Sequence, residues 1–381
     1  MSSHSIFNFL HFHKIHSLNN LCLRQMRKHN FNSGPSILPQ EVLEQAADAI
    51  KNFNGINLSL LEIGHRSKWF VDVMEEARNL VKELMQLNEN FEVLFLHGGA
   101  TTQFMQIPLN LLNNHETAAY CDNGIWGSKA INEASVFGNV NIVASSKEKN
   151  YTYINKNFDI PTNSKYLHLT SNNTVEGTQW HQFPTTSVPL IADMSSDIFS
   201  RKIDFNSFSL MYAGAQKNMG AAGVSLVVVN KNILGKNSRK IPAIMDYQNH
   251  INANSLLNTP PVFAIYVALL TLRWIKKEGG LAAMEKRAEE KSSLLYNTID
   301  NFPIYTTYVE KADRSKMNAV FFIEDENLQN KFLEECNNNS MIGVKGYRTV
   351  GGIRLSMYNA LPYASVAAIS QLMTNFAIKH G

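Results

Sequence analysis

The chain has 381 residues, enough for one large domain and a smaller one. Its 35 Lys and Arg residues and 32 Asp and Glu residues give a net charge of only +3, and no apolar run approaches the roughly 20 residues that cross a bilayer, so neither nucleic acid nor a membrane is an expected partner. The three cysteines, Cys22, Cys121 and Cys336, show no metal-ligand spacing, so we expect no disulfide framework, no metal site and a reducing, cytoplasmic compartment.

Residues 1–25 differ in composition from the rest of the chain. They are rich in His, Asn, Ser and Phe, and no Asp or Glu occurs before Glu41. Acid-poor segments with Ser and Arg also occur in transit peptides, but the only Lys and Arg before Met26 are Lys14 and Arg24. We therefore expect an N-terminal extension that is disordered or artefactual, with translation starting at Met26.

Two amphipathic helices are predicted where the globular sequence begins. Pro39-Gln40-Glu41 opens the first, because apolar residues then recur on one stripe as far as Ile50. The second runs from about Lys68 to Met85, with apolar residues three and four positions apart and charged residues between them.

Short apolar runs then alternate with helical stretches, which predicts a mostly parallel sheet between helices. We assign residues 26–279 to this large α/β domain, with roughly its first 15 residues on the smaller domain. Ligands of such sheets bind outside the carboxyl ends of the strands. The seven predicted strands are Val93–Leu96, Ala118–Cys121, Val140–Ala144, Tyr166–Thr170, Leu190–Asp193, Leu210–Ala213 and Val224–Val229.

The C-terminal part of the chain predicts a separate α+β unit over residues 280–381. A helix from about Phe263 to Trp274 is followed by a break at Gly279-Gly280. The elements expected after the break are a helix from Leu281, a strand over Ala319–Ile323, a helix near Leu328–Asn337 and a last helix over Ala364–Lys379.

A glycine turn follows the first strand of the large domain. The segment from Phe95 to Gln103 contains Gly98-Gly99 and leads into a helix expected from about Gln103. Backbone N–H groups at such a turn and the helix N-terminus favour an anion, so the segment is a candidate phosphate cradle. It is neither GxGxxG nor GxxxxGK[ST], which argues against a dinucleotide or a nucleoside triphosphate.

Two strand ends carry candidate catalytic residues. Asp193 closes an apolar strand, where a carboxylate can pair with a ring nitrogen, bind a metal or cap the next turn. Lys217 follows the next strand among small residues, where a desolvated lysine has a lowered pKa and becomes nucleophilic. A phosphate cradle, then Trp126 between glycines, then Asp193 and Lys217 is the order seen in aspartate-aminotransferase-like enzymes that use pyridoxal 5'-phosphate.

The sequence resembles the phosphoserine aminotransferase family, within the class V aminotransferases, from about Asn30 to Gly381. This resemblance implies fold type I of the pyridoxal-phosphate-dependent transferases, an α/β fold with a large domain and a smaller C-terminal one. The segments that carry it, in chain order, are Phe31–Pro35, Glu62–Ser67, Gly98–Phe104, Ser171–Gly177, Ala192–Ser196, Tyr212–Asn218, Asn258–Pro261 and Gly351–Arg354.

The resemblance implies a role for each residue around the cofactor. Lys217 would carry pyridoxal phosphate covalently and move the proton at the substrate Cα, while Asp193 would pair with the ring nitrogen. Trp126 would stack on the ring and Thr174 would bond its phenolic oxygen. The phosphate would be held by Ala100, Thr101 and Gln216, and by Asn258 and Thr259 of a second subunit in a homodimer with shared sites.

The substrates implied by the resemblance are L-glutamate and 3-phosphohydroxypyruvate, which give 2-oxoglutarate and O-phosphoserine in serine biosynthesis. Some members also act on a phosphorylated threonine analogue in vitamin B6 synthesis. Arg354 would bind the α-carboxylate, and His65, Arg66 and Arg348 would bind the distal anion.

Two positions depart from the pattern of the family. Tyr347 stands where members often have His, so it is expected to be a neutral contact at most. Thr101-Thr102 occupies a turn where some members carry Arg. Because of these two changes, the sequence predicts the cofactor and the reaction type more firmly than it predicts the preferred substrate.

Three other functions remain as alternatives. Another class V aminotransferase, acting on alanine, glyoxylate or a different 2-oxo acid, would have no need of a distal basic cluster. A nicotinamide dehydrogenase would need a GxGxxG motif near its first strand, which is missing here. A non-catalytic binding module would not need Lys217 and Asp193 together.

Overall fold

The computed structural model describes residues 27–381, so the predicted N-terminal extension lies outside the described residues. The large sheet has the strand order β2-β8-β7-β6-β5-β3-β4. Its strands are β2 (Phe91–His97), β3 (Thr117–Asp122), β4 (Asn139–Ser145), β5 (Leu167–Thr170), β6 (Leu190–Asp193), β7 (Leu210–Gly214) and β8 (Val224–Asn230).

The predicted sheet is confirmed, and only one of its strands runs against the others. β8 is antiparallel to both neighbours, β2 and β7, whereas the strands from β7 to β4 pair in parallel. β6 and β7 are buried along their whole length, as expected for strands covered by helices on both faces.

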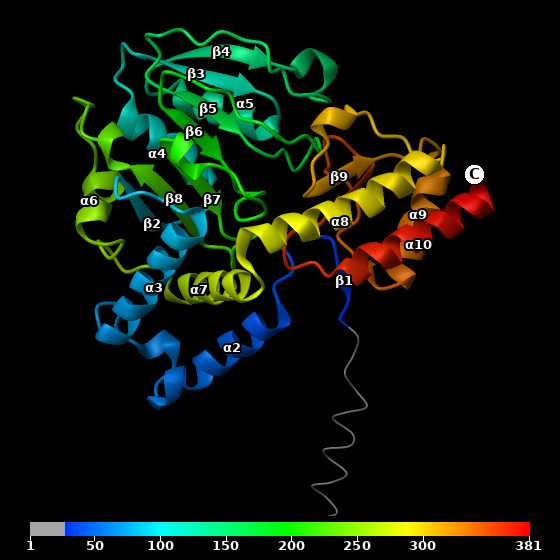
Figure 1. Cartoon of the computed structure of the whole chain (residues 1–381), viewed down its shortest axis with the longest axis horizontal. Helices are drawn as coiled ribbons and strands as arrows, with labels where there is room; N and C mark the ends of the chain where they lie inside the picture. Colours follow the sequence, from blue (N-terminus) through cyan, green and yellow to red (C-terminus); the bar gives the residue numbers. More distant parts are fainter. Residues whose placement is uncertain (1–26) are drawn as a thin grey trace, which may run out of the picture.

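Nine α-helices are present in residues 27–381, and six of them cover the two faces of the sheet (Figure 1). Alternate residues of β2 divide between two cores: Val93 and Phe95 pack with α2, α3 and α7, whereas Leu94 and Leu96 pack with α4, α5 and α6. The helices are α2 (Gln40–Lys51), α3 (Lys68–Met85), α4 (Thr101–Leu111), α5 (Ile125–Ala134), α6 (Tyr247–Asn252), α7 (Val262–Lys277), α8 (Gly280–Asn301), α9 (Glu326–Asn338) and α10 (Tyr363–His380).

A smaller unit with its own core lies beside the sheet, on the right of Figure 1. It contains the antiparallel pair β9 (Asn318–Phe321) and β11 (Ile353–Ser356), covered by α8, α9 and α10. The chain turns into this unit at Gly279, whose φ of +102° is a conformation that favours glycine. None of the helices in residues 27–381 is long and apolar enough to cross a membrane.

The start of the described chain also lies with the smaller unit. β1 (His29–Asn30) pairs in parallel with β10 (Met341–Ile342), and Phe31 and Ile37 belong to the core of that unit. The chain then crosses to the large sheet, so residues 33–36 lie at the junction of the two units, beside the carboxyl end of β7. Both units therefore contribute to whatever binds at this edge of the sheet.

Candidate active site

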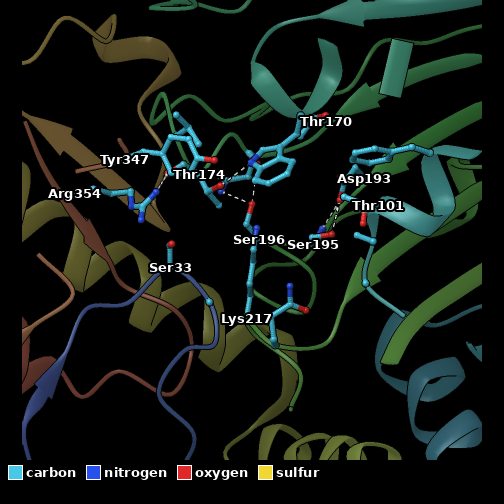
Figure 2. Close-up of a pocket in the computed structure, with 18 residues that line it drawn as sticks. Ser33, Thr101, Thr170, Thr174, Asp193, Ser195, Ser196, Lys217, Tyr347 and Arg354 are labelled. Carbon is cyan, nitrogen blue, oxygen red and sulfur yellow. Dashed lines mark hydrogen bonds between the residues drawn. The ribbon is translucent and has the colours of Figure 1, made fainter. Parts of the chain in front are cut away.

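A cavity of about 290 Å³ opens at the carboxyl ends of the parallel strands, where the two units meet. Figure 2 shows Asp193, Ser195 and Thr101 on one side, Tyr347 and Arg354 on the other, and Lys217 between them. Nine residues predicted for the site line this cavity: Ala100, Thr101, Trp126, Thr174, Asp193, Gln216, Lys217, Tyr347 and Arg354.

Lys217 reaches the cavity from the turn after β7. Desolvation lowers the pKa of its ammonium group to about 8, although the charge of Asp193 acts in the opposite direction. Nζ lies 5.8 Å from the centre of the Trp126 ring. A fraction of the amine is therefore neutral near pH 7 and able to act as a nucleophile or a base.

A segment from the beginning of the described chain packs against Lys217. Ser36 N donates to Gln216 O over 2.9 Å, and Ser36 Oγ donates to Lys217 O. Gly34 has a φ of +139°, and a Cβ at this position would lie 3.3 Å from Lys217 Cγ. Glycine at position 34 therefore lets the segment close over the lysine without displacing it.

Asp193 ends β6 with one carboxylate oxygen bonded and the other facing the cavity. Ser195 donates to Oδ1 twice, from its backbone N over 2.9 Å and from Oγ over 2.6 Å. No described residue bonds Oδ2, and Asp193 lines the cavity. Burial raises the pKa of this carboxyl, and the Ser195 hydrogen bonds oppose the rise. The site thus offers one acceptor oxygen to a cationic N–H group.

The glycine turn after β2 leads into α4, which begins at Thr101, two residues earlier than predicted. Gly98 has a φ of +92°, and α4 has no side-chain cap. The N–H groups of Ala100 and Thr101 bond to no described residue. Unpaired N–H groups at the N-terminus of an 11-residue helix favour an anion, because the helix dipole adds to their own partial charge.

The side chains of Trp126 and Thr174 are joined across the cavity wall. Trp126 lies at the start of α5, and its Nε1–H donates to Thr174 Oγ1 over 3.0 Å. Because the Thr174 oxygen accepts this bond, its own O–H proton remains available to a ligand in the cavity.

Arg354 lies on β11 and brings a buried positive charge to the opposite side. It is 9% exposed, and its NH1 donates to Thr174 O over 3.3 Å. Its Nε is buried without a hydrogen-bond partner among the described residues, and burial lowers the pKa of the guanidinium. The Tyr347 ring lies against it, 5.9 Å from the guanidinium carbon. An unpaired, desolvated guanidinium is suited to bind a carboxylate.

The predicted distal basic cluster is not assembled within one chain. Arg66 and Arg348 are exposed, His65 is half-buried, and none of the three lines the cavity. His65 Nε2 is nevertheless buried and has no hydrogen-bond partner among the described residues.

Asn258 and Thr259 also lie outside the cavity of their own chain. Asn258 Nδ2 is 3.1 Å from His97 Nδ1, at the end of β2, and Thr259 is exposed. If these two residues hold a phosphate, it belongs to another subunit.

Sequence reasoning missed half of the residues that line the cavity. Ser195 had a signal, because a hydroxyl two residues after a strand-end carboxylate often bonds it. The other missed residues are Ser33, Gly34, Gly99, Phe104, Thr170, Asn172, Val175 and Ser196.

The residues present fit pyridoxal phosphate. The α4 N-terminus offers free N–H groups to a phosphate, Asp193 offers Oδ2 to a ring nitrogen, and Lys217 offers an amine of lowered pKa. Trp126 supplies a flat surface for an aromatic ring.

Comparisons with known proteins agree with this fit. The family model for class V aminotransferases matches residues 28–369. The phosphoserine aminotransferase of Flavobacterium johnsoniae is 52% identical over 349 residues, which cover 91% of this chain and 98% of that protein.

Two solved structures are similar over the same range. The phosphoserine aminotransferase of Bacillus circulans subsp. alkalophilus has a TM-score of 0.91 at 42% identity, covering 93% of this chain and 99% of its own. The pyridoxal-phosphate-bound phosphoserine aminotransferase of Trichomonas vaginalis has a TM-score of 0.87 at 35% identity, covering 91% of this chain and 100% of its own.

Proposed function

This chain belongs to the class V aminotransferase family, and from that membership we propose that it transfers the amino group between L-glutamate and 3-phosphohydroxypyruvate. The products would be O-phospho-L-serine and 2-oxoglutarate, a step of serine biosynthesis in the cytoplasm. The observation that carries the proposal is the cavity lined by Lys217, by Asp193, whose Oδ2 no described residue bonds, and by Arg354, whose Nε has no partner among the described residues.

Residues from four strand ends would hold the cofactor. Ala100 and Thr101 would bind its phosphate with their free N–H groups, together with Gln216 after β7. Thr174 would donate its hydroxyl proton to the phenolic oxygen, because its oxygen already accepts a hydrogen bond from Trp126 Nε1. Lys217 would carry the group covalently.

Asp193 and Lys217 would have separate roles, one at the ring nitrogen of the cofactor and the other at the substrate Cα. When bound, pyridoxal phosphate supplies the conjugated ring that takes up the electrons released at the substrate Cα. Asp193 Oδ2 would keep the ring nitrogen protonated, because a cationic N–H beside it stabilises the charged form of this buried carboxyl group. The Nζ of Lys217 would take the proton from Cα and return it, a task for which a pKa of about 8 is suitable.

The two substrates require one fixed anion clamp and one adaptable cationic end. Arg354 would bind the α-carboxylate that all substrates share, with Tyr347 packed against its guanidinium. The distal phosphate or carboxylate would be bound by His65, Arg66 and Arg348 once they are brought to the cavity.

A homodimer would bring these residues to the cavity. Leu61 and Trp69, which flank the segment His65–Arg66, are 56% and 46% exposed, and exposed large apolar side chains around a loop favour a protein contact. Burial of His65 Nε2 without a partner indicates that the segment lacks a contact in the single chain. Asn258 and Thr259 would reach the phosphate of the second subunit in the same assembly.

Substrate assays separate this proposal from other class V activities. Purified protein loaded with pyridoxal phosphate should form 2-oxoglutarate from glutamate with 3-phosphohydroxypyruvate, and much more slowly with pyruvate or glyoxylate, which have no distal anion. The 2-oxo acid of 4-phosphohydroxy-L-threonine should also be accepted, since it carries the same two anionic ends. Lys217→Ala should have no activity with any acceptor, and preference for pyruvate or glyoxylate would favour the alternative aminotransferase.

A further inference from the structure

Glu176, which no step above uses, lies buried behind the wall of the cavity. It is 8% exposed, and its Oε1 accepts a hydrogen bond from Ile125 N, the first residue of α5, over 2.7 Å. Its Oε2 is buried and has no partner among the described residues. Burial and the charge of Asp122 raise the pKa of the Glu176 carboxyl to about 7, although Ile125 N–H and Arg354 favour the charged form.

A second unpaired acceptor lies near Glu176 Oε2, beside Gly124. Asn173 Oδ1 is also buried without a partner among the described residues. The position that a Cβ on Gly124 would occupy lies 2.4 Å from Asn173 Oδ1 and 3.1 Å from Glu176 Oε2. Both acceptor oxygens therefore lie close to Gly124, with no donor from a described residue between them if Glu176 is ionised.

The Asn173 amide cannot turn over to supply the donor. Its Nδ2 donates to Asn123 O over 2.9 Å and to Thr178 Oγ1 over 3.0 Å. A turned amide would place its oxygen against the carbonyl oxygen of Asn123 and lose that bond, whereas the Thr178 hydroxyl can bond the amide in either arrangement. Of the Asn173 and Glu176 side chains, only a protonated Glu176 carboxyl group can supply the missing donor.

The neighbouring carboxyl, Asp122, is much better supplied with donors. Asp122 accepts from Ser128 Oγ over 2.6 Å and from Tyr151 OH over 3.2 and 3.3 Å. A like charge nearby raises the pKa of a buried carboxyl group, and few donors are present at Glu176 to oppose that rise. Asp122 and Tyr151 beside α5, and Arg354 on β11, are the titratable or charged groups whose charge acts on Glu176 or is acted on by it.

We propose that Glu176 is a neutral carboxylic acid in the resting enzyme and donates a hydrogen bond from Oε2 to Asn173 Oδ1. This bond lies within residues 173–178 and joins the two side chains that bond the turn from Asn123 to Trp126, Glu176 at Ile125 N and Asn173 at Asn123 O. The same two segments meet again where Trp126 Nε1 donates to Thr174 Oγ1. Glu176 is thus a positioning residue that fixes the Trp126 ring and the Thr174 hydroxyl relative to each other in the cavity wall.

The test compares unfolding of the cofactor-loaded enzyme and its Glu176→Gln variant at about pH 5 and about pH 8, with equal excess cofactor. Glutamine keeps an acceptor for Ile125 N–H and a permanent donor for Asn173. A carboxyl whose folded-state pKa is raised loses its stabilising effect as pH rises from its unfolded value, 4.5, towards about 7. The variant should therefore gain stability relative to wild type as pH rises, by roughly 10- to 100-fold in the ratio of the unfolding constants.

Controls make the result specific to this proton. Glu310→Gln, at an exposed position, should show no such pH-dependent difference. The infrared carbonyl band of this protonated carboxyl should be present in wild type at about pH 5, fall to about half near pH 7 and be missing from Glu176→Gln. A variant that loses relative stability at high pH, or a constant difference, would show that Glu176 acts as an ionised acceptor, bridged to Asn173 by water. If Glu176→Gln does not fold, absence of the band from wild type overturns the proposal.

Discussion

Asn359 N donates a hydrogen bond to Asn218 Oδ1 over 3.0 Å, which joins the smaller unit to the residue that follows Lys217. Asn218 Nδ2 also donates to Ser196 O over 3.1 Å, so the amide links three segments around the cavity. Asn359 in turn donates from Nδ2 to Phe199 O over 2.9 Å. The backbone of the lysine is therefore held from both units.

Replacing Asn218 with alanine should destabilise the protein and weaken the placement of Lys217. Asn218 is buried, and its loss leaves Asn359 N–H and Ser196 O unpaired, at a cost of about 1–3 kcal/mol in the free energy of unfolding. Urea unfolding measures this loss, with Asn301→Ala at an exposed helix end as the matched control. Equal stability of the two variants would contradict the link between the units.

Replacing Asp193 with alanine should leave cofactor binding detectable but slow the reaction. Without Oδ2 the ring nitrogen loses its anionic partner, while the α4 N-terminus and Lys217 still hold the cofactor. One charge-assisted contact corresponds to about 1.5–3 kcal/mol, or roughly 10- to 150-fold in kcat/KM. Visible absorption and turnover, measured on the same sample, test the two halves of this prediction, and near-normal turnover would remove Asp193 from its role.

Lys291 on α8 gives a pH dependence with a definite sign. Its Nζ is buried and lies within hydrogen-bond distance of three carbonyl oxygens, those of Met357, Tyr358 and Leu361, in the segment that carries Asn359. The ammonium form can donate to all three, and the neutral amine to two of them. Burial lowers its pKa from 10.5 to about 7. Between those values the unfolded chain binds more protons than the folded one, so this group makes the protein more stable as pH rises from about 7 towards 10.

Replacement of Lys291 with methionine should remove that pH dependence and also destabilise the protein. The three carbonyl groups lose their donor, which costs about 1–3 kcal/mol for each group that water cannot reach. Denaturant unfolding at several pH values tests both effects, with Lys286→Met on the exposed face of the same helix as the control. A wild type and a variant with parallel pH profiles would contradict the lowered pKa.

The exposed apolar residues near His65 allow a test of the proposed homodimer. Trp69→Glu should lower the share of dimer in sedimentation experiments, because a charge would be buried in the contact. Ile378→Glu, on α10 and 75% exposed, is a matched change that should have no such effect. If Trp69→Glu leaves a fully active dimer, this surface is not the interface.

The strands of the large sheet and the meeting of Asp193 and Lys217 in one cavity were predictable because they follow from local pattern. The runs in β6 and β8 are almost wholly apolar, and parallel strands end at one edge, which brings Asp193 and the turn before Lys217 together. β11 was not predicted, because Arg354 interrupts its short apolar run directly after Gly351-Gly352.

Contacts made through tertiary packing were beyond sequence reasoning. Gly34 and Ser36 contact Lys217, although about 180 residues of sequence separate them. Nothing in the spacing of residues 33–36 indicates that they lie at the cavity. Glu176 gave no signal either, because its unusual environment arises from Asp122 and Asn173, which reach it from other parts of the fold. Resemblance to a family supplied the motif around Glu176 but no role for its carboxyl group.

The two arginines near Tyr347 should separate the two ends of the substrate. Arg354, buried in the cavity wall, should bind the α-carboxylate that glutamate and phosphoserine share, so Arg354→Ala should impair both half-reactions. Arg348, exposed on the adjacent loop, should bind only the distal anion. That anion is a dianionic phosphate in phosphoserine and a singly charged carboxylate in glutamate, so Arg348→Ala should harm the phosphoserine half-reaction more.

The size of the difference follows from the charges. Losing one charge-assisted contact costs about 1.5–3 kcal/mol, or roughly 10- to 150-fold in kcat/KM for phosphoserine. Because the monoanion of glutamate uses the same site, the difference between the two donors should be on the order of tenfold. Single-turnover spectroscopy of the cofactor with each amino donor measures it, and Arg239→Ala, far along the chain and bonded to Phe137 O, serves as the control for general loss of fold. Equal losses for both donors would contradict the division of roles, and full activity of Arg348→Ala on phosphoserine would exclude Arg348 from the site.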